Sequence, residues 1–331
     1  MTVVTRLDPP GPPARETRDG FEVVRLPVSR WPLARTVLDL ARIEGAVRRL
    51  APRPDLLLCF QTFLSGVAGV RLQGSLGIPA VVWIRHTDEY RLSSSPLARL
   101  TGPRVWATAR GVLVQSEANR REMLAELGRR SASLAARVGS RLGVGPNGLE
   151  LPRAPGPPGG RVLTVGRLVR GKGVGVVIDA MAGLRAGLTV AGDGPERARL
   201  EARARRLGLD ARFEGFVSRA RLDVLYREAA CVALASRGEG LPNVVLESFA
   251  HARPVVATPV AGTADLVTDG ANGLLVPHGD AAALRAALSR LTGEPALAAR
   301  LGRGGREVAE TFAWERVEPQ LEAALGRWCR P

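Results

Sequence analysis

Two glutamates, Glu239 and Glu247, lie eight positions apart on either side of a Gly-Leu-Pro bend. Pro242 suits the first turn of a helix, because its missing N–H costs nothing there. We therefore expect a helix over residues 242–252 that stops before the next proline. Both carboxylates would face the helix N-terminus, where unpaired N–H groups attract a phosphate. Two solvated surface glutamates are the alternative, but residues 255–257 read as a buried strand, which places the loop at a sheet edge.

A glycine-rich loop upstream could hold the same phosphate. Gly166-x4-Gly171-Lys172 meets most of the Walker A pattern, but Gly173 follows where a P-loop needs Ser or Thr for magnesium. We interpret it as a phosphate cradle without an obligatory metal, in which Arg167 and Lys172 supply positive charge. Lys172 is the only lysine among 47 basic residues. A compact ammonium suits a tight pocket better than a planar guanidinium does. A surface arginine and a surface lysine are the alternative.

Composition restricts the class of protein. The length of 331 residues favours two domains, and 45% hydrophobic content fits a globular α/β protein. No apolar run approaches the ~18 residues of a membrane span, and the first residues do not resemble a signal peptide. Cys59, Cys231 and Cys329 have no metal-ligand spacing, and such a sparse, odd set fits a reducing cytosol. We expect no metal and no cofactor.

The net charge of +15 has three interpretations. Arginines alternate with acids along the expected helices, which is typical of solvated helix faces. The same charge could attract an anionic membrane. Two tyrosines and no aromatic–basic motif make nucleic-acid binding an unfavoured third interpretation.

The elements that must position these residues alternate between strands and helices in both halves of the chain. This alternation predicts parallel, doubly wound sheets. The expected strands are Thr2–Thr5, Phe21–Leu26, Asp55–Phe60, Ala80–Ile84, Gly111–Val114, Arg161–Val165, Leu188–Ala191, Arg212–Phe213, Cys231–Ala235, Val255–Ala257 and Gly273–Val276.

The motifs resemble those of retaining glycosyltransferases of family 4. The resemblance rests on five segments in the family's order, which cover essentially all of residues 161–315. They are Glu239-x7-Glu247, Val165-Gly166-Arg167-Leu168 with Lys172-Gly173, Ala191-Gly192-Asp193-Gly194-Pro195-Glu196, Gly215-Phe216-Val217 and Asn272-Gly273-Leu274.

The resemblance implies an α/β protein with the GT-B fold. Two Rossmann-like, doubly wound parallel-sheet domains would enclose the active site in the cleft between them. The expected parts are an N-terminal acceptor-side domain (1–151), a linker (152–160), a nucleotide-sugar-binding domain (161–311) and a C-terminal helix that crosses back (312–331).

Family members begin with a strand and a Gly-rich turn ahead of the strand that residues 1–5 resemble. In a doubly wound sheet this strand is central, so its absence would expose two strand edges in mid-sheet. We expect the N-terminal domain to be truncated at its start by a strand and its crossover, about 30 residues. A rearranged N-terminal sheet is the alternative.

The resemblance also implies roles for individual residues. Arg167 and Lys172 would neutralise a diphosphate leaving group, Glu239 would contact the sugar hydroxyls, and Glu247 would bind the ribose. His86 or Asp88, after the strand that ends at Ile84, would face the transferred sugar, although a lone histidine is as often structural. Asn147-Gly148 and Ser116 are weaker candidates. The remaining donor-binding candidates are Gly166, Gly192, Phe216, Val217, Gly240, Leu241, Pro242, Asn243 and Val244.

The implied function is a retaining, hexosyltransferase-type reaction. A sugar would pass from a UDP- or GDP-type donor to a hydroxyl acceptor, either a glycan or a lipid-linked envelope intermediate. Because both glutamates would hold the donor, we favour a front-face reaction in which the departing phosphate deprotonates the acceptor. The expected location is cytoplasmic, with peripheral contact to the inner face of the membrane. A non-catalytic donor-binding or scaffold protein and a nucleotide-sugar epimerase on the same fold are the alternatives.

Overall fold

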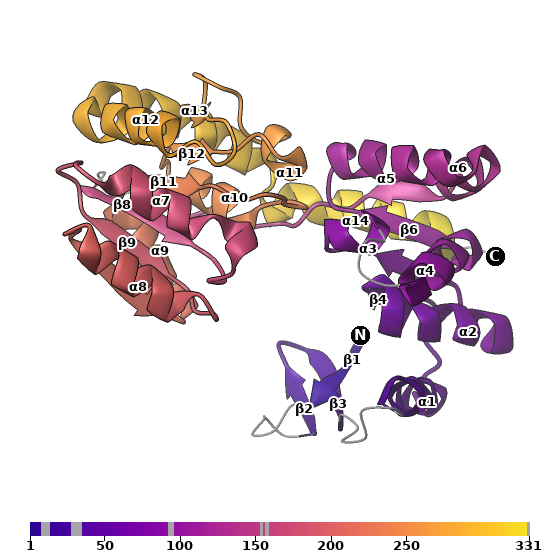
Figure 1. Cartoon of the computed structure of the whole chain (residues 1–331). Coiled ribbons are helices and arrows are strands. Elements are labelled where there is room, and N and C mark those ends of the chain that lie inside the picture. The colour runs from indigo at the N-terminus through magenta and orange to yellow at the C-terminus, as the bar shows by residue number, and fades with distance from the viewer. Residues whose placement is uncertain (8–13, 28–34, 92–95, 153–154, 156–158, 330–331) are drawn as a thin grey trace. The chain divides into compact units, whose positions relative to one another are not determined.

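The computed structural model describes residues 1–7, 14–27, 35–91, 96–152, 155 and 159–329. The chain forms two compact units. Most of unit 1 is coloured indigo to magenta in Figure 1, and most of unit 2 is coloured magenta to yellow. Unit 1 comprises Met1–Val114, Arg120–Gly145 and Glu322–Pro331; unit 2 comprises Gln115–Asn119 and Pro146–Leu321. The predicted boundary between domains stays a prediction, and residues 153–154 and 156–158 of the predicted linker lie outside the described residues.

Unit 2 contains one six-stranded parallel sheet in the order β10-β9-β8-β11-β12-β13. The order reverses direction between β8 and β11, as in a doubly wound fold. Every residue of β9, β11 and β12 is buried, which explains their continuous apolar sequences. The strands are β8 (Arg161–Val165), β9 (Leu188–Ala191), β10 (Ala211–Gly215), β11 (Ala229–Leu234), β12 (Val255–Ala257) and β13 (Gly273–Leu275).

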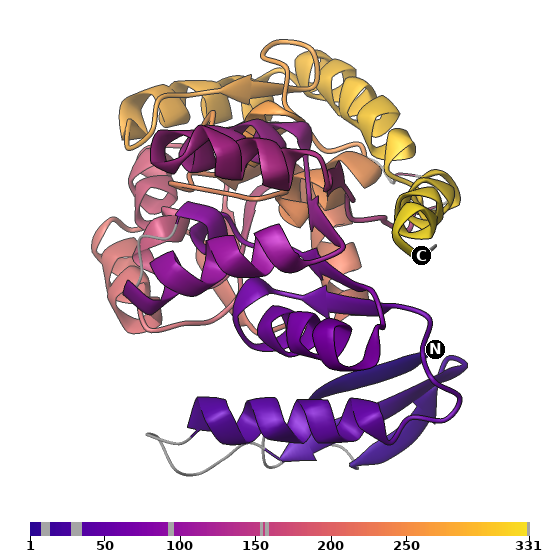
Figure 2. The same cartoon turned by 90° about the vertical axis from the view of Figure 1, so that its right-hand side faces the viewer.

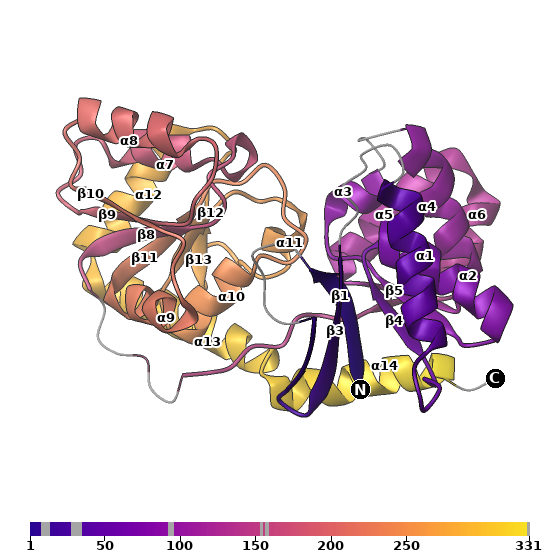
Figure 3. The same cartoon turned by 90° about the horizontal axis from the view of Figure 1, so that it is seen from below.

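Helices cover both faces of this sheet. One face packs against α7, α8 and α12, and the other against α9 and α10, while α13 contributes residues to both cores (Figure 3). Successive residues of β11 point to opposite faces, because Cys231 belongs to the first core and Val232 to the second. The elements are η2 (Arg170–Lys172), α7 (Val174–Met181), α8 (Arg197–Arg206), α9 (Arg219–Glu228), α10 (Asn243–Ala250), α11 (Ala261–Ala264), α12 (Ala281–Gly293) and α13 (Pro295–Thr311).

Unit 1 contains two separate sheets. β4-β5-β6-β7 is parallel throughout, whereas β1-β3-β2 pairs β1 with β3 in parallel and β2 with β3 antiparallel. The strands are β1 (Thr2–Leu7), β2 (Arg15–Arg18), β3 (Phe21–Pro27), β4 (Leu57–Phe60), β5 (Ala80–Trp83), β6 (Gly111–Val114) and β7 (Leu142–Val144). The antiparallel strand β2 and the short strand β7 were not predicted.

The hydrophobic core of unit 1 is built from β4 onwards. Its buried residues include Val82, Trp106 and Met123, and the described residues of β1–β3 contribute none to it. Helix α1 packs beside the three-stranded sheet, which Figure 2 shows as indigo strands. The helices are α1 (Arg35–Arg48), η1 (Thr62–Gly66, a π-helical turn), α2 (Val67–Leu76), α3 (Thr87–Arg91), α4 (Pro96–Thr108), α5 (Glu117–Arg130) and α6 (Ala132–Gly139).

The last helix, α14 (Trp314–Cys329), belongs in part to each unit. Its residues up to Leu321 are assigned to unit 2, and those from Glu322 onwards are assigned to unit 1. In unit 1 its Trp328 ring lies against two strand glycines. A Cβ built on Gly111 would lie 2.3 Å from a ring atom of Trp328, and one built on Gly143 would lie 3.2 Å away. The small residues therefore leave room for the tryptophan.

Substituting Gly111 by alanine should destabilise unit 1 by about 1–3 kcal/mol, because overpacking displaces the Trp328 ring. The matched control is Gly128→Ala inside helix α5, where an added Cβ meets nothing within 4 Å. That change should stabilise the protein by about 0.5–1 kcal/mol. Urea unfolding of both variants checks the sign. Equal effects would show that Trp328 does not pack against β6 in solution.

Candidate functional site

The candidate site lies at the end of the unit 2 sheet where the carboxyl ends of its parallel strands meet. This end is called the sheet edge below. Strand β8 leads into the glycine-rich loop, β9 into the turn at Gly192, and β11 into the segment that carries both glutamates. The Leu168 amide donates to Asp193 O at 2.9 Å, and the Arg237 amide donates to Gly171 O at 2.9 Å. The fold therefore brings together the two motifs that the sequence singled out.

Two glycines allow these loops to approach closely. Gly173 has a φ of +67°, and a Cβ there would lie 2.0 Å from Ala235 O. Gly192 has a φ of +138°, and a Cβ there would lie 2.0 Å from Gly166 O. Any side chain at either position would force the backbones apart. Glycine is therefore required at both positions, for its positive φ and for the lack of space.

Lys172 and Glu239 form an ion pair at the centre of the site. The Nζ atom donates to both carboxylate oxygens, at 2.7 Å to Oε1 and 2.9 Å to Oε2. The side chain of Glu239 is 10% exposed and that of Lys172 is 34% exposed. A partly buried ammonium is therefore fixed at this sheet edge, with one face turned to solvent.

The other predicted binding residues surround this pair. Arg167 is exposed on the glycine-rich loop and has no ion-pair partner among the described residues. Phe216 is 93% exposed beside Gly215, whose carbonyl accepts from the Gly192 amide at 2.8 Å. Val217, by contrast, packs against the hydrophobic core.

The segment between the two glutamates starts helix α10 one residue later than expected. Pro242 is the N-cap, with a φ of −74°, and the helix runs from Asn243 to Ala250 rather than from Pro242 to Ala252. The side chain of Leu241 lies in the hydrophobic core, so only its backbone and that of Gly240 are available to a ligand. Asn243 and Val244 form the first helical turn, and the Asn243 side-chain oxygen accepts from the Asn147 amide at 2.7 Å.

Glu247 is held by two residues of helix α9. Arg219 donates to its Oε1, and the Tyr226 hydroxyl donates to Oε2 at 2.8 Å. The Glu247 side chain is 16% exposed and lines a hollow of about 280 Å³ together with Arg219, Asn243 and Trp314. The carboxylate is thus oriented into an open space beside the first turn of α10.

A buried layer supports this carboxylate from behind. Tyr226 is fully buried, and its burial, followed by the charge of Glu247, raises its pKa well above the usual value. The His251 ring stacks on Tyr226 with a centroid separation of 5.2 Å, and its Nδ1 lies 2.8 Å from Glu247 O. Burial lowers the pKa of His251, so the imidazole is kept neutral.

Arg219 and Tyr226 are the site residues that sequence reasoning missed. They lie seven positions apart and thus on one face of helix α9. The same spacing is equally typical of a helix whose arginine faces solvent and whose tyrosine packs in the core. Arginine and tyrosine at this spacing carry no chemical signature of their own. Only the packing of α9 against α10 identifies them.

His86 belongs to unit 1, so its role beside the residues of unit 2 stays a prediction. It is exposed and follows β5, which ends at Trp83. The buried carboxylate of Glu89 accepts from the backbone amides of His86, Arg85 and Thr62, at 3.3, 3.1 and 2.6 Å. This fixes the loop that carries His86. The side chain of Asp88, the other predicted residue here, lies outside the description.

Two kinds of feature are absent from the residues that the structure describes. No group of three or more His, Cys, Asp or Glu side chains could hold a metal ion. In the same part of the chain, no helix is both long and apolar enough to cross a membrane.

Two family models match the chain. Residues 1–136 match "Glycosyl transferase 4-like domain", and residues 159–294 match "Glycosyl transferases group 1". Together these matches account for most of the sequence. One curated relative is the lipopolysaccharide core biosynthesis glycosyltransferase LpsE of Rhizobium meliloti, which is 36% identical over 149 residues. That alignment covers 44% of this chain and 43% of LpsE, so it spans less than half of either protein.

Solved structures resemble almost the whole chain. Sucrose-phosphate synthase from Thermosynechococcus elongatus has a TM-score of 0.82 at 24% identity, covering 98% of this chain and 88% of that protein. HepE of Anabaena, solved in complex with UDP and glucose, has a TM-score of 0.76 at 20% identity, covering 92% and 86%. These similarities show the fold: two Rossmann-like α/β units of the GT-B type, as the sequence predicted.

The neutral, buried His251 should make stability depend on pH. The unfolded chain protonates this imidazole near pH 6.5, whereas the folded protein does so only at lower pH. The unfolded state therefore binds more protons, and the stability that His251 contributes is present above pH 6.5 and lost as the pH falls through its lower folded pKa.

The measurement is urea unfolding at pH 7.5 and 5.5 for the wild type and His251→Phe, which keeps the ring on Tyr226. The wild type should lose more stability on acidification than this variant does. His278→Phe, at an exposed histidine that Arg237 contacts, is the control and should behave like the wild type. Identical losses in the wild type and His251→Phe would contradict the assignment.

Proposed function

This chain belongs to the glycosyltransferases and has the GT-B fold, and from this we propose its reaction. A hexosyl group would pass from a nucleotide-diphosphate sugar to a hydroxyl acceptor, with retention of configuration at the anomeric carbon. The Lys172–Glu239 pair carries this proposal. It combines one fixed ammonium and one fixed carboxylate at the edge where the glycine-rich loop and the start of α10 meet. A diphosphate and a sugar need that combination.

The diphosphate would bind between Lys172 and the N-terminus of α10. Free N–H groups and the helix dipole favour a negative charge there. Exposed Arg167 can reach the same ligand from the glycine-rich loop. As the bond to the sugar breaks, charge accumulates on the departing phosphate, and these groups stabilise it without reorganisation.

The two glutamates would divide the rest of the donor. Glu239 lies beside Lys172 and would accept hydrogen bonds from the sugar hydroxyls. Glu247, oriented by Tyr226 and Arg219, would accept the ribose hydroxyls in the adjacent hollow. Each carboxylate oxygen has a second lone pair, so Tyr226 can keep its hydrogen bond while the ribose binds. Phe216 would lie near the base, and no metal or cofactor would be required.

Retention would follow from a front-face reaction. Both glutamates of the site are engaged, Glu239 by Lys172 and Glu247 by α9, so neither is presented as a nucleophile. The departing phosphate would then take the proton of the attacking hydroxyl. We assign His86 of unit 1 to contact the transferred sugar.

The donor and acceptor classes are proposed from the relatives. HepE was solved with UDP, which favours a UDP-type donor over a GDP-type donor. LpsE acts in lipopolysaccharide core biosynthesis, which favours a glycan or lipid-linked envelope acceptor. Such an acceptor would be reached from the cytoplasm, with peripheral contact between this chain, whose net charge is +15, and anionic lipid.

Thermal unfolding with UDP, GDP, ADP and UDP-glucose tests donor binding. One nucleotide at 100 times its Kd should stabilise the protein by about 2.7 kcal/mol. Lys172→Met and Glu247→Gln should each weaken that binding by about 1.5–3 kcal/mol, because each removes a charged hydrogen-bonding partner. Arg170→Met, at an exposed arginine of the same loop, is the matched control and should bind normally. A protein that none of these ligands stabilises is not the proposed enzyme.

The stereochemistry is tested by proton NMR of the first-formed product. The preferred α-linked donor is incubated with a panel of octyl glycosides, and the anomeric coupling of the newly formed glycosidic linkage is read. An α-linked product is expected. A β-linked product would show inversion and exclude the front-face mechanism.

A further inference from the structure

Arg237 carries a positive charge at the sheet edge of unit 2 to which the donor contacts described so far assign no role. It follows strand β11 and lies two positions before Glu239 on the same loop. Because two residues of extended chain span at most about 7 Å, its backbone lies close to the residue that we assign to the sugar. Arg237 is exposed and has no carboxylate partner among the residues that the structure describes.

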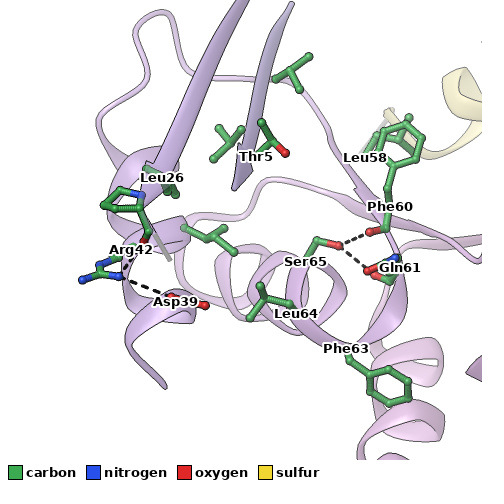
Figure 4. A pocket seen from close by; sticks show the side chains of 14 residues that line it. Thr5, Leu26, Asp39, Arg42, Leu58, Phe60, Gln61, Phe63, Leu64 and Ser65 are labelled. Carbon is green, nitrogen blue, oxygen red and sulfur yellow. Dashed lines mark hydrogen bonds and ion pairs between the residues drawn. The ribbon is translucent and has the colours of Figure 1, made fainter. Parts of the chain in front are cut away.

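A different side chain contacts this guanidinium. Arg42 of helix α1 shows the usual arrangement, because it lies 3.6 Å from the carboxylate of Asp39 beside a hollow of unit 1 (Figure 4). The Nε atom of Arg237 instead donates to Nε2 of His278 at 3.2 Å. An imidazole nitrogen accepts a hydrogen bond only when it carries no proton. The contact therefore orients the guanidinium without neutralising its charge.

The geometry of the contact leaves the outer end of the guanidinium for a ligand. The hydrogen bond to His278 uses the Nε atom, and within the described part of the chain nothing accepts from Nη1 or Nη2 of Arg237. These two terminal nitrogens donate in parallel directions, and the pair matches the two oxygens of a carboxylate. A planar carboxylate could therefore form two charge-assisted hydrogen bonds here.

Both members of the contact come from loops whose backbones are held in place. The Arg237 amide donates to Gly171 O in the glycine-rich loop at 2.9 Å. His278 lies between β13 and helix α12, whose N-cap Asp280 accepts from two amides of the first turn, at 3.0 and 2.9 Å. The guanidinium is thus oriented before a ligand binds, which lowers the entropy cost of binding.

The charges at this sheet edge exceed those that a diphosphate needs. We assign Lys172 and Arg167 to the diphosphate, together with the first N–H groups of α10. Lys172 is also paired with Glu239. Arg237 adds a positive charge on the loop of Glu239, which would contact the sugar. A neutral sugar gives this guanidinium no ionic partner, whereas a sugar with a carboxylate does.

We propose that Arg237, oriented by His278, selects a donor whose sugar is a hexuronic acid. This inference rests on the proposed function and names the class of sugar that would be transferred. Nη1 and Nη2 of Arg237 would bind the two oxygens of the carboxylate at C6. The carboxylate would take no part in the bond that forms or the bond that breaks, so Arg237 is a specificity-determining residue.

Calorimetric titration of the intact protein with matched donors tests this inference. The pairs are UDP-glucuronic acid with UDP-glucose, and GDP-mannuronic acid with GDP-mannose, so that only the group at C6 differs within a pair. For the base that the protein binds, the uronic acid should bind about tenfold more tightly, because it gains a charge-assisted contact. Arg237→Gln should remove this preference and leave the Kd of the free nucleoside diphosphate unchanged.

Three further variants separate orientation and shape from charge. Arg237→Lys keeps the charge but not the two parallel donors, and should lose most of the preference. His278→Phe removes the acceptor that orients the guanidinium and should also reduce the preference. Arg170→Gln, at an exposed arginine of the glycine-rich loop, is the matched control and should keep the preference in full.

An acceptor could carry the same carboxylate, and a second titration separates the two sources. Octyl glucuronide and octyl glucoside are each titrated into the protein saturated with UDP. A preference for the glucuronide that depends on Arg237, without any preference within the donor pairs, would place the carboxylate on the acceptor and overturn the assignment to the donor.

Other outcomes would also overturn the inference. These are equal Kd values within each donor pair, an equal loss of preference in Arg170→Gln, and full preference in Arg237→Lys. If UDP or GDP binds while its two sugars bind equally, only the inference about Arg237 fails and the proposed transfer stands. If no nucleotide binds, both fail together.

Discussion

The ion pair between Lys172 and Glu239 forms because the parallel sheet of unit 2 brings their two loops together. Its two residues come from the loops after β8 and β11, which are adjacent in the sheet although far apart in sequence. The carboxyl ends of parallel strands meet at one edge, so loops that follow neighbouring strands must approach each other. Gly173 makes this approach possible, since any side chain there would strike Ala235 O.

The charged groups at this end of the sheet are paired with one another before a ligand binds. Glu239 neutralises Lys172, and Arg219 with Tyr226 satisfies Glu247, so neither carboxylate is left buried without a partner. A donor would exchange these internal contacts for its own. Binding would then depend on the difference between two sets of charge-assisted hydrogen bonds, which makes the proposed affinity sensitive to single substitutions at Lys172 or Glu247.

Unit 1 has a different kind of order. Its four-stranded sheet has a well-packed core, whereas its three-stranded sheet makes no core contribution from the described residues. Strands β1 and β4 each pair with a described strand on one side alone. The truncated start that the sequence analysis expects stays a prediction. The antiparallel strand β2, which was not predicted, pairs with the far side of β3.

The sequence by itself determined much of unit 2. Apolar runs such as Cys231–Ala235 predict buried strands because residues covered on both faces must be apolar. The Gly-x4-Gly-Lys spacing predicts a loop that binds phosphate, and this role stays a prediction. It also placed the start of α10 within one residue, because a proline at a helix start is a local signal. These are features that neighbouring residues decide.

Only the tertiary structure decided which side chains support the site. Arg219 and Tyr226 reach Glu247 from a helix 21 or more positions earlier, and nothing local distinguishes that arginine from the other arginines of α9. The same holds for the sheets of unit 1. Strand pairing depends on long-range backbone contacts that residue types do not encode, so β1, β3, β4, β5 and β6 were predictable as strands but their division into two sheets was not.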